Sequence, residues 1–378
     1  MEVKPTLETV AREARVSRQT VSNVLNFPGR VAPPTLARVR DAIGRTGYRT
    51  DEAARQLRTR RSRVIGLRIE PVLDGVNGVV LDLFRHAITE SAQQLGYRVL
   101  LFVAADDAAE TDEYEALVSG HGLDAFVVTG THHGDRRTAW LARRSVPFVT
   151  FGRPWGNPRA GGGDGGTPDQ DSRTAASAHC WVDVDGAAGT GAAVDALVAA
   201  GHRRIAHLGW PTGSGAGDDR RAGWAAAVQR HGLAVGGLDL AGEDSIATGA
   251  ALARHVLEAV GRPPPTALVC ASDSLALGAL AAVRELGLLP GADVAVVGFD
   301  DTPVGAAVGL SSVAQPIAAA AECCLELLHD QVRRRDGALD PPVQRLLTPT
   351  LVLRASGPTP RSTDSHRQPP TVPVKEYS

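Results

Sequence analysis

The sequence lacks the marks of an exported or membrane-spanning chain. It contains no run of about 18 apolar residues, the length that a membrane helix needs. The N-terminal stretch MEVKPTLETVAREARVS has no apolar core such as a signal peptide carries. Hydrophobic residues make up 43% of the chain and charged residues 22%, which is ordinary for a globular protein. We therefore expect a cytoplasmic protein that makes no contact with a membrane.

Motifs of metal binding and catalysis are missing as well. Four cysteines without metal-ligand spacing are expected to be idle thiols: Cys180, Cys270, Cys323 and Cys324. HExxH, GxSxG and CxxC do not occur, and the histidines are scattered. The side chains of the adjacent His132 and His133 should diverge, which makes a shared metal improbable. We expect no catalytic residue, no cofactor and no metal.

Charge is distributed unevenly along the 378 residues. The whole chain has a formal net charge of −2, but residues 1–62 carry 13 Lys and Arg against 6 Asp and Glu, a net charge of +7. The remainder must therefore total −9. A basic head on an acidic body is typical of a nucleic-acid-binding domain joined to a separate soluble domain.

Residues 1–49 predict three short helices. Apolar side chains recur at helical spacing in three segments: Leu7, Val10, Ala11 and Ala14; Val21, Val24 and Leu25; Leu36, Val39 and Ile43. Thr6 and Ser17 are candidate N-caps of the first two helices, and Pro33 opens a third that ends near Gly47. Because about three residues separate the first two helices, we predict a helix-turn-helix.

The second helix of this motif exposes side chains that can read DNA. Arg18 can bind guanine bidentately, and Gln19 and Asn23 can bind adenine from the same face. Further candidate DNA contacts, several of them suited to phosphates, are Thr6, Ser17, Thr20, Ser22, Asn26 and Arg30. An ordinary solvated face of a three-helix bundle remains the alternative.

Residues 50–62 form a basic linker. In TDEAARQLRTRRSR, five arginines surround Leu57, and Asp51 can cap a short helix. Arginines suit a DNA minor groove, and an apolar side chain can wedge between base steps. The composition therefore favours a DNA-contacting hinge over a plain linker.

At this point a family resemblance becomes specific. TLETVAREARVSRQTVSNVLN…GYRTDEAARQL, within residues 6–58, resembles the signature of the lactose-repressor (LacI/GalR) family of bacterial transcription regulators. Weaker similarity continues to about residue 354. The resemblance implies that Arg18, Gln19 and Asn23 face bases, and that Ala54 and Leu57 belong to a hinge helix whose leucine opens the centre of the operator.

Two positions depart from the family pattern. A glycine is common in the first turn, where this chain has Arg15, and a Ser or Thr often caps the third helix, where it has Ala32. If the φ angle of Arg15 is positive, the turn is strained by about 1 kcal/mol. Neither departure removes a DNA-contact candidate.

Residues 63–354 alternate between strand-like and helix-like patterns. The apolar runs are RVIGLRI, RVLLFVA, DAFVVTG, VPFVTFG, RRIAHLG, PTALVCA and DVAVVGF, and helical stretches such as 79–95, 135–144, 219–232 and 274–287 lie between them. This order predicts an α/β fold with two doubly wound lobes and a ligand cleft at the carboxyl ends of the strands. The resemblance implies a type I periplasmic-binding-protein-like body in which the chain crosses between lobes more than once.

Two segments interrupt the α/β pattern. The Gly- and Pro-rich residues 154–180 predict a flexible surface loop, and residues 355–378, with five prolines, predict a disordered tail. The tail has no heptads, so we expect no tetramerising coiled coil there.

Candidate effector residues lie at strand ends and helix starts. GSGAGDDRRAGW spells GxGxG and lacks a P-loop lysine, so it does not predict a nucleotide site. The resemblance implies effector contacts for Arg220, three residues before Gly223, and we also expect Trp224, next to that glycine, to contact the effector. Further candidates are Asp300, Ser272, Asp273, Arg153 and Glu70, although a structural role for Asp273 at a helix start is equally plausible.

Three functions remain in competition. The leading hypothesis is a DNA-binding transcriptional regulator, with repression favoured, that binds a pseudo-palindromic operator in double-stranded DNA as a homodimer. Its effector would be a small polar molecule, most plausibly a sugar. A Rossmann-like enzyme lacks its dinucleotide fingerprint, and an exported solute-binding protein lacks its signal peptide. The effector's identity, and whether it releases DNA or strengthens its binding, stay open.

Overall fold

The computed structural model describes residues 5–48, 61–69, 78–156, 179–334 and 341–358. The chain divides into two compact units, Met1–Ser62 and Arg63–Ser378. Among the described residues, no helix is both long and apolar enough to cross a bilayer.

The N-terminal unit is a small helical bundle. Its helices are α1 (Leu7–Glu13), α2 (Arg18–Asn26), the short 3-10 turn η1 (Pro28–Arg30) and α3 (Pro33–Thr46). One side chain from each α-helix, Val10, Val21 and Val39, is completely buried in the shared core. The predicted helices and their inner faces are confirmed, since local spacing alone determines which face of a short helix is apolar.

Caps account for where these helices begin and end. Thr6 accepts a hydrogen bond from the backbone N–H of Thr9, and Ser17 accepts one from Thr20, so both N-caps are confirmed. Helix α3 begins after Ala32 without a side-chain cap. It ends at Gly47, whose φ of 64° is the left-handed conformation that glycine adopts readily.

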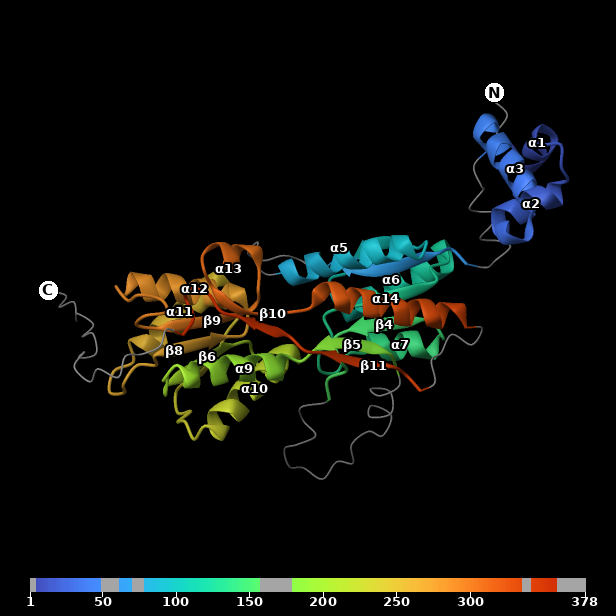
Figure 1. Cartoon of the computed structure of the whole chain (residues 1–378). Helices are drawn as coiled ribbons and strands as arrows, with labels where there is room; N and C mark the ends of the chain where they lie inside the picture. Colours follow the sequence, from blue (N-terminus) through green and yellow to red (C-terminus); the bar gives the residue numbers. More distant parts are fainter. Residues whose placement is uncertain (1–4, 49–60, 70–77, 157–178, 335–340, 359–378) are drawn as a thin grey trace. The chain divides into compact units, whose positions relative to one another are not determined.

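The second unit contains two lobes, each built around a six-stranded sheet (Figure 1). Lobe 1 has the order β11-β5-β4-β3-β1-β2, and lobe 2 has the order β12-β10-β9-β8-β6-β7. The strands of lobe 1 are β1 (Val64–Ile69), β2 (Arg98–Val103), β3 (Ala125–Val128), β4 (Phe148–Phe151), β5 (Trp181–Val184) and β11 (Gln344–Leu347). Those of lobe 2 are β6 (Ile205–Gly209), β7 (Asp239–Ala241), β8 (Ala267–Cys270), β9 (Ala295–Asp300), β10 (Ser311–Ala314) and β12 (Thr350–Val352). Only the β10–β12 pair among these described strands is antiparallel, as expected for doubly wound α/β lobes.

Helices cover the sheets. In lobe 1 they are α5 (Val79–Gln94), α6 (Asp107–Ala116), the π-helical turn η2 (Leu117–His121), α7 (Arg137–Arg143) and α14 (Ile317–Arg333). In lobe 2 they are α9 (Gly186–Ala199), α10 (Ala216–Arg230), α11 (Ile246–Leu257), α12 (Asp273–Glu285) and α13 (Pro303–Ala307). Lobe 1 has two separate cores, one around Phe84 and Leu328 and one around Tyr114 and Phe126. Since apolar side chains of a parallel sheet project from both faces, helices are needed on each side.

The chain passes between the lobes three times within the described residues. It crosses from β5 to α9, from β10 to α14, and from β11 to β12 (Figure 1). The implied repeated crossing is therefore confirmed.

Both predicted irregular segments are shorter than expected. At the end of the 154–180 segment, His179 and Cys180 are buried and lead into β5, while residues 157–178 lie outside the described residues. At the start of the predicted tail, Ser356 is buried because it exchanges hydrogen bonds with strands β9 and β10. These contacts are long-range and leave no periodic signal in the sequence.

Candidate functional site

Helix α2 presents the predicted DNA-reading face. Arg18 and Gln19 are exposed, and the Gln19 side-chain amide donates to the Asn23 side-chain oxygen at 3.1 Å. Behind this face, Val21 and Val24 are buried against α1 and α3. The apolar contacts thereby fix the rotation of the helix, and three candidate base-reading side chains share its outer surface.

The hydroxyl candidates beside this face have local partners. Ser17 caps α2, and its hydroxyl lies 2.8 Å from the hydroxyl of Thr20. Thr6 likewise caps α1. Ser22 is partly buried on α2. These side chains organise the helix starts, and hydroxyls retain acceptor and donor capacity for a phosphate.

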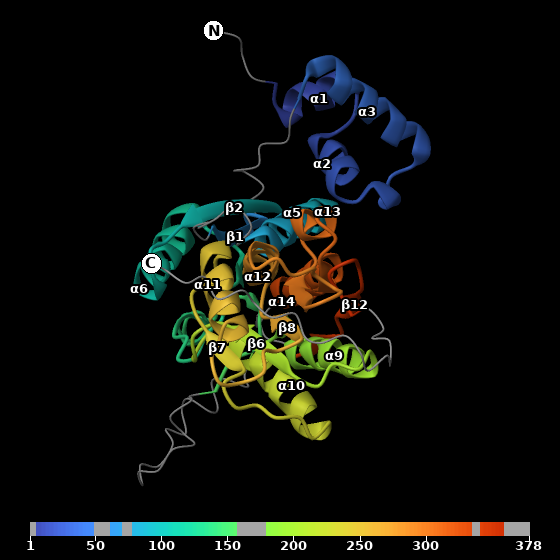
Figure 2. The same cartoon turned by 90° about the vertical axis from the view of Figure 1, so that its left-hand side faces the viewer.

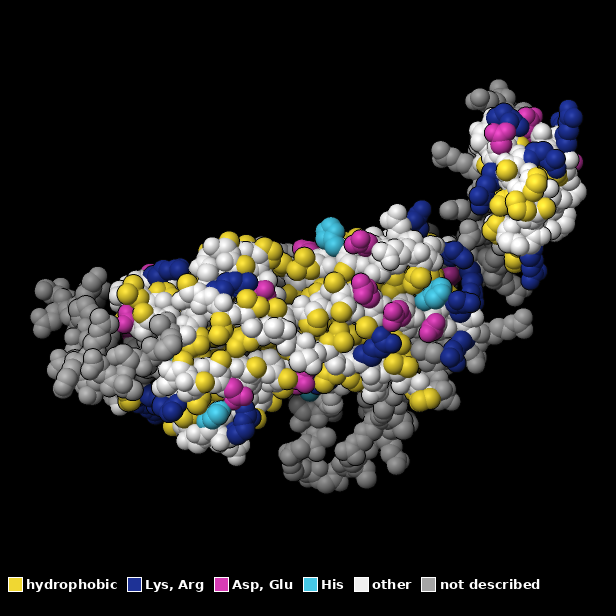
Figure 3. Space-filling view, viewed as in Figure 1, with side chains coloured by type: hydrophobic (Ala, Val, Ile, Leu, Met, Phe, Trp, Pro, Cys, Tyr) yellow, Lys and Arg dark blue, Asp and Glu magenta, His cyan; other side chains and the backbone are white. Residues whose placement is uncertain are grey.

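The turn before α2 and the segment after it have distinctive features. Arg15 has a φ of 52°, so the strain expected there is present. The exposed Phe27 side chain lies under the Arg30 guanidinium, 5.2 Å from its ring centroid. Lys and Arg side chains are prominent on the surface of this unit (Figure 3). The Asn26 side chain, Ala54 and Leu57 lie outside the described residues, and their roles remain predictions.

The effector candidates meet at the strand ends of lobe 2. Arg220, in the first turns of α10, is 7% exposed and donates to the Ala271 carbonyl after β8. Its guanidinium lies 3.5 Å from an Asp300 carboxylate oxygen. It also lies over the rings of Phe299, at 3.8 Å, and Trp210, at 4.9 Å. The two rings and the Ala271 carbonyl thus hold the N–H donors of the Arg220 guanidinium in one orientation.

Asp300 supplies the acceptor of this site. It ends β9 with a φ of 111° and accepts a 2.7 Å hydrogen bond from the Gln315 amide. The pKa of Asp300 is raised to about 7: burial is the main cause and nearby Asp273 and Asp244 contribute, while Arg220 and the Gln315 hydrogen bond act in the opposite direction. A carboxylate offers about four lone-pair positions, so the Gln315 bond leaves acceptor capacity for a ligand.

Ser272 and Asp273 have structural partners. Ser272 caps α12 by accepting from the Leu275 N–H at 3.2 Å, and its hydroxyl donates to Asp244. Asp273 is fully buried and accepts hydrogen bonds from Thr302 and Ser312. For Asp273, the structural alternative is the better description, because its carboxylate orders the start of α13.

Trp224 does not belong to the effector site. Its side chain is 2% exposed, and its indole N–H donates to the Ile205 carbonyl at 3.2 Å within the core of lobe 2. The expectation that it contacts an effector is therefore corrected. Trp224 and Arg220 are one helical turn apart, and burial of the large ring against β6 leaves the arginine to reach the strand ends.

Of the two remaining effector candidates, the one within the described residues lies in lobe 1. Arg153, after β4, pairs with Asp183 at 2.5 Å and with Asp219 of lobe 2 at 3.2 Å. It therefore lies where the lobes meet, beside one acidic side chain from each lobe. Glu70 lies outside the described residues, and its role remains a prediction.

Three residues that contact the candidate pair Arg220 and Asp300 were not predicted: Gln315, Trp210 and Phe299. Gln315 follows β10, Trp210 follows β6, and Phe299 precedes Asp300 in β9. Each lies at the end of a strand, and this position is the sequence feature by which it could have been identified as a candidate. Their convergence on Arg220 and Asp300 depends on sheet order.

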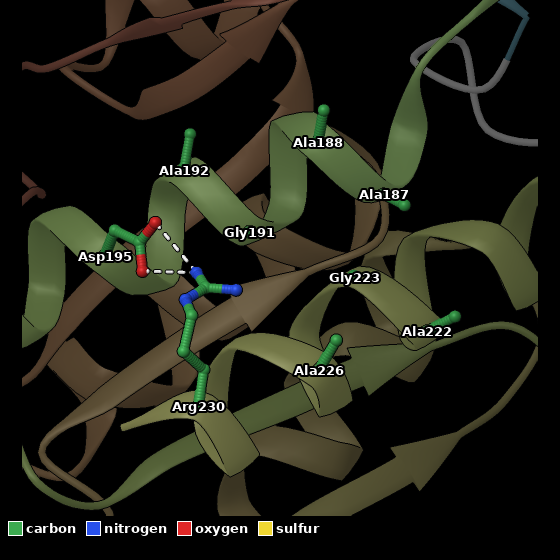
Figure 4. A pocket seen from close by; sticks show the side chains of 9 residues that line it. All are labelled: Ala187, Ala188, Gly191, Ala192, Asp195, Ala222, Gly223, Ala226 and Arg230. Atoms are coloured by element: carbon green, nitrogen blue, oxygen red, sulfur yellow. Dashed lines mark hydrogen bonds and ion pairs between the residues drawn. The ribbon is translucent and has the colours of Figure 1, made fainter.

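A groove of about 520 Å³ lies between α9 and α10, away from this site (Figure 4). It is lined mainly by Ala and Gly, and its charged side chains, Asp195 and Arg230, bind each other at 2.7 and 2.9 Å. Such a lining offers few hydrogen-bond donors and acceptors to the hydroxyls of a polyol. The groove is therefore a weaker candidate for the effector than the Arg220–Asp300 site.

One group in the described chain has potential metal ligands, namely Asp107, His132 and Asp135, whose ligand atoms lie within 4.8 Å of one another. The buried Arg137 guanidinium lies 2.7 Å from Asp135 and 3.5 Å from Asp107. A cation would therefore compete with a guanidinium already bound to the same carboxylates. As predicted, His132 and His133 diverge, since the latter faces Asp218.

Comparison with known proteins gives two family matches. Residues 6–51 match the model described as bacterial regulatory proteins, lacI family, and residues 194–357 match a periplasmic binding protein-like domain. The HTH-type transcriptional regulator CelR of Thermobifida fusca is 31% identical over 367 residues, which cover 94% of this chain and 98% of that protein.

Two solved structures are similar over nearly the whole chain. The lac repressor dimer bound to operator and the anti-inducer ONPF has a TM-score of 0.73 at 25% identity, covering 94% of this chain and all of the other, 100%. A complex of CelR with cellobiose has a TM-score of 0.65 at 27% identity, with the same coverage, 94% and 100%.

Proposed function

Because the chain belongs to the lacI family of bacterial regulatory proteins and is a DNA-binding transcriptional regulator, we propose that it is a cytoplasmic repressor controlled by a sugar. It binds a pseudo-palindromic operator as a homodimer, and the sugar binds between its lobes. The Arg220–Asp300 pair carries this proposal, since a fixed donor fork beside a carboxylate complements the hydroxyls of a polyol. The complex of CelR with cellobiose supports a sugar as the ligand class.

The proposed domains follow the sequence analysis. Residues 1–49 read DNA, residues 50–62 form the hinge with Ala54 and Leu57, and residues 63–354 bind the effector and dimerise. One recognition helix contacts too few base pairs for high specificity, so two copies and two half-sites are required.

Exposed apolar side chains support dimerisation. Leu83 on α5 is 43% exposed, and Leu101 and Val103 on the edge strand β2 are 48% and 74% exposed. On α13 and just after it, Val304 and Val308 are 48% and 44% exposed. Helices α5 and α13 lie along the same edge of this unit in both views (Figures 1 and 2). Burying this edge against a second copy removes apolar surface from water.

The experiment begins with the operator. Selection of duplexes from a random pool by the purified protein, followed by sequencing, should return an inverted repeat with two half-sites. Gln19→Ala should relax the preference at one position in each half-site, because a lost base contact costs about 1–3 kcal/mol of discrimination. The control Gln229→Ala removes an exposed glutamine from α10 and should leave the preference unchanged. Enrichment of no sequence would contradict the proposal.

The sugar is then sought with the operator in hand. A panel of monosaccharides and disaccharides, beginning with cellobiose, is screened for a change in operator affinity, and binding is measured by calorimetry. Asp300→Asn should weaken binding at least about tenfold, since a bond to a charged group contributes about 1.5–3 kcal/mol. Asp195→Asn is the matched control, because Asp195 also pairs with an arginine but outside the site. Equal loss in both variants would refute the site.

A further inference from the structure

Strand β9, which carries Asp300, ends in an unusual turn. Asp300 and Asp301 have φ angles of 111° and 53°, so two consecutive residues with side chains adopt conformations that glycine tolerates better. The chain then forms α13 and returns at Leu310 to the start of β10. An Asp300 carboxylate oxygen lies 3.5 Å from the Arg220 guanidinium, whereas Asp301 accepts a 2.6 Å hydrogen bond from Arg354. The turn therefore directs the two neighbouring carboxylates to different arginines.

Arg354 joins the two ends of the segment 301–310. One nitrogen of its guanidinium donates both to the Asp301 carboxylate and to the Leu310 carbonyl oxygen, the latter at 2.9 Å. The backbone of Arg354 is fixed as well. Its N–H donates to the Ser311 hydroxyl at 2.7 Å, and this hydroxyl donates to the Arg354 carbonyl oxygen at 3.2 Å. Because the arginine is anchored on β10, its side chain can restrain the turn after β9.

Other contacts hold the backbone N–H groups that follow the turn. The Asp301 N–H donates to the Ser312 hydroxyl at 3.0 Å, and the Thr302 N–H donates to Asp273 at 2.7 Å. Ser312 itself donates to Asp273 at 2.6 Å. Arg354 adds the contact to the Asp301 side chain. A residue with a positive φ keeps this conformation where its surroundings determine it from several sides, and these contacts provide such surroundings.

We propose that Arg354 is a positioning residue of the effector site: by binding Asp301 it holds the left-handed turn and thereby directs Asp300 to Arg220. This role rests on the effector site proposed above, and it is exerted through Asp301 rather than by contact with the effector. Without Arg354 the turn relaxes toward negative φ, because a residue with a side chain gains free energy by leaving the left-handed region. Rotation of the backbone at positions 300 and 301 then moves the Asp300 carboxylate away from Arg220 and Gln315.

The experiment follows the Asp300 carboxyl group in the chain without operator or sugar. Its outcome is therefore separate from those of the operator selection and the sugar screen. Aspartate labelled with carbon-13 at the side-chain carboxyl carbon is incorporated, and the Asp300 resonance is the one missing from Asp300→Asn. Titration followed by carbon NMR then reports the pKa of Asp300, which burial raises to about 7.

Arg354→Gln should lower the pKa of Asp300 at least halfway toward the ordinary value of about 3.9, because a released carboxylate is hydrated. The direction is diagnostic, since loss of a nearby positive charge would by itself raise the pKa of a carboxyl group. The substitution keeps the backbone hydrogen bonds between position 354 and Ser311, so lobe 2 should stay folded. Arg254→Gln, which breaks an exposed pair with Glu285, is the matched control and should leave the pKa at about 7.

Two substitutions of Asp301 separate the effect of the φ angle from that of the charge. Asp301→Ala and Asp301→Gly both remove the partner of Arg354, but glycine adopts a φ of 53° without strain and alanine does not. We expect the pKa of Asp300 to fall in the alanine variant and to stay closer to the parent value in the glycine variant. Equal pKa values in these two variants, or an unchanged or raised pKa in Arg354→Gln, overturn the proposal.

Discussion

Gly223 allows α10 to cross α9 at very short range. A Cβ at this position would lie 2.2 Å from the Ala187 carbonyl oxygen and 2.6 Å from its Cα. Non-bonded carbon atoms prefer separations of about 3.5–4.0 Å. Gly191, on the facing helix, is different: a Cβ there would lie 3.9 Å from the Gly223 carbonyl oxygen, an ordinary contact. The two glycines therefore form a matched pair for the substitution to alanine.

The expected changes in stability have opposite signs. In a helix interior, alanine is favoured over glycine by about 1 kcal/mol. Gly191→Ala should therefore raise the free energy of unfolding by about 1 kcal/mol. Gly223→Ala gains the same propensity, but forcing a methyl group into a packed crossing costs about 1–3 kcal/mol or more. Its net effect should be a loss of up to about 2 kcal/mol, because the backbone of Ala187 cannot turn aside as a side chain could.

Gly223→Ala should also weaken sugar binding. Arg220 lies less than one turn before Gly223 on α10, so separation of the helices moves its guanidinium away from Ala271 and Asp300. The assays are urea unfolding of both variants, compared by midpoint and slope, and calorimetry with the sugar from the screen. If both variants shift the midpoint in the same direction and bind sugar equally, the close crossing does not position Arg220.

Three other perturbations follow from the same structure. Arg15→Gly should stabilise the N-terminal unit by up to about 1 kcal/mol, since it relieves the φ of 52°; a lower melting temperature would contradict this. Asp300 has a pKa raised from 3.8 to about 7, so the folded chain binds this proton more tightly than the unfolded chain. Stability should therefore fall as pH rises from about 4 to about 7, by about 4 kcal/mol at most, and urea titrations of Asp300→Asn should lack this contribution. Asp273→Ala removes the acceptor of the Thr302 and Ser312 hydrogen bonds and should lower the free energy of unfolding by about 2–4 kcal/mol. Asp195→Ala, at an exposed ion pair, should lower it by less than about 1 kcal/mol. Similar losses of stability in the two variants, measured by thermal unfolding, would argue against the buried network.

Local spacing was sufficient for the N-terminal unit. The apolar residues at helical intervals, the caps Thr6 and Ser17, and the stop at Gly47 all act within a few residues, so the sequence predicted them correctly. The sequence also predicted the strands of the two lobes that form continuous apolar runs, because a strand buried on both faces has few polar positions. The strands β5, β7, β10, β11 and β12 were missed. Four of them are partly exposed strands of three or four residues, which resemble loops, and β10 is buried but only four residues long.

The candidate effector site shows what the sequence alone could not predict. Arg220 and Trp224 stand one helical turn apart and looked like a pair, yet one reaches the strand ends and the other enters the core. Gln315 joins Asp300 across neighbouring strands, although 15 residues separate them. The sequence determined which residues could bind a polyol or DNA, because residue chemistry is local. Only the tertiary structure decided which of them meet, because sheet order and helix crossing bring together positions whose separation along the chain carries no record of their contact.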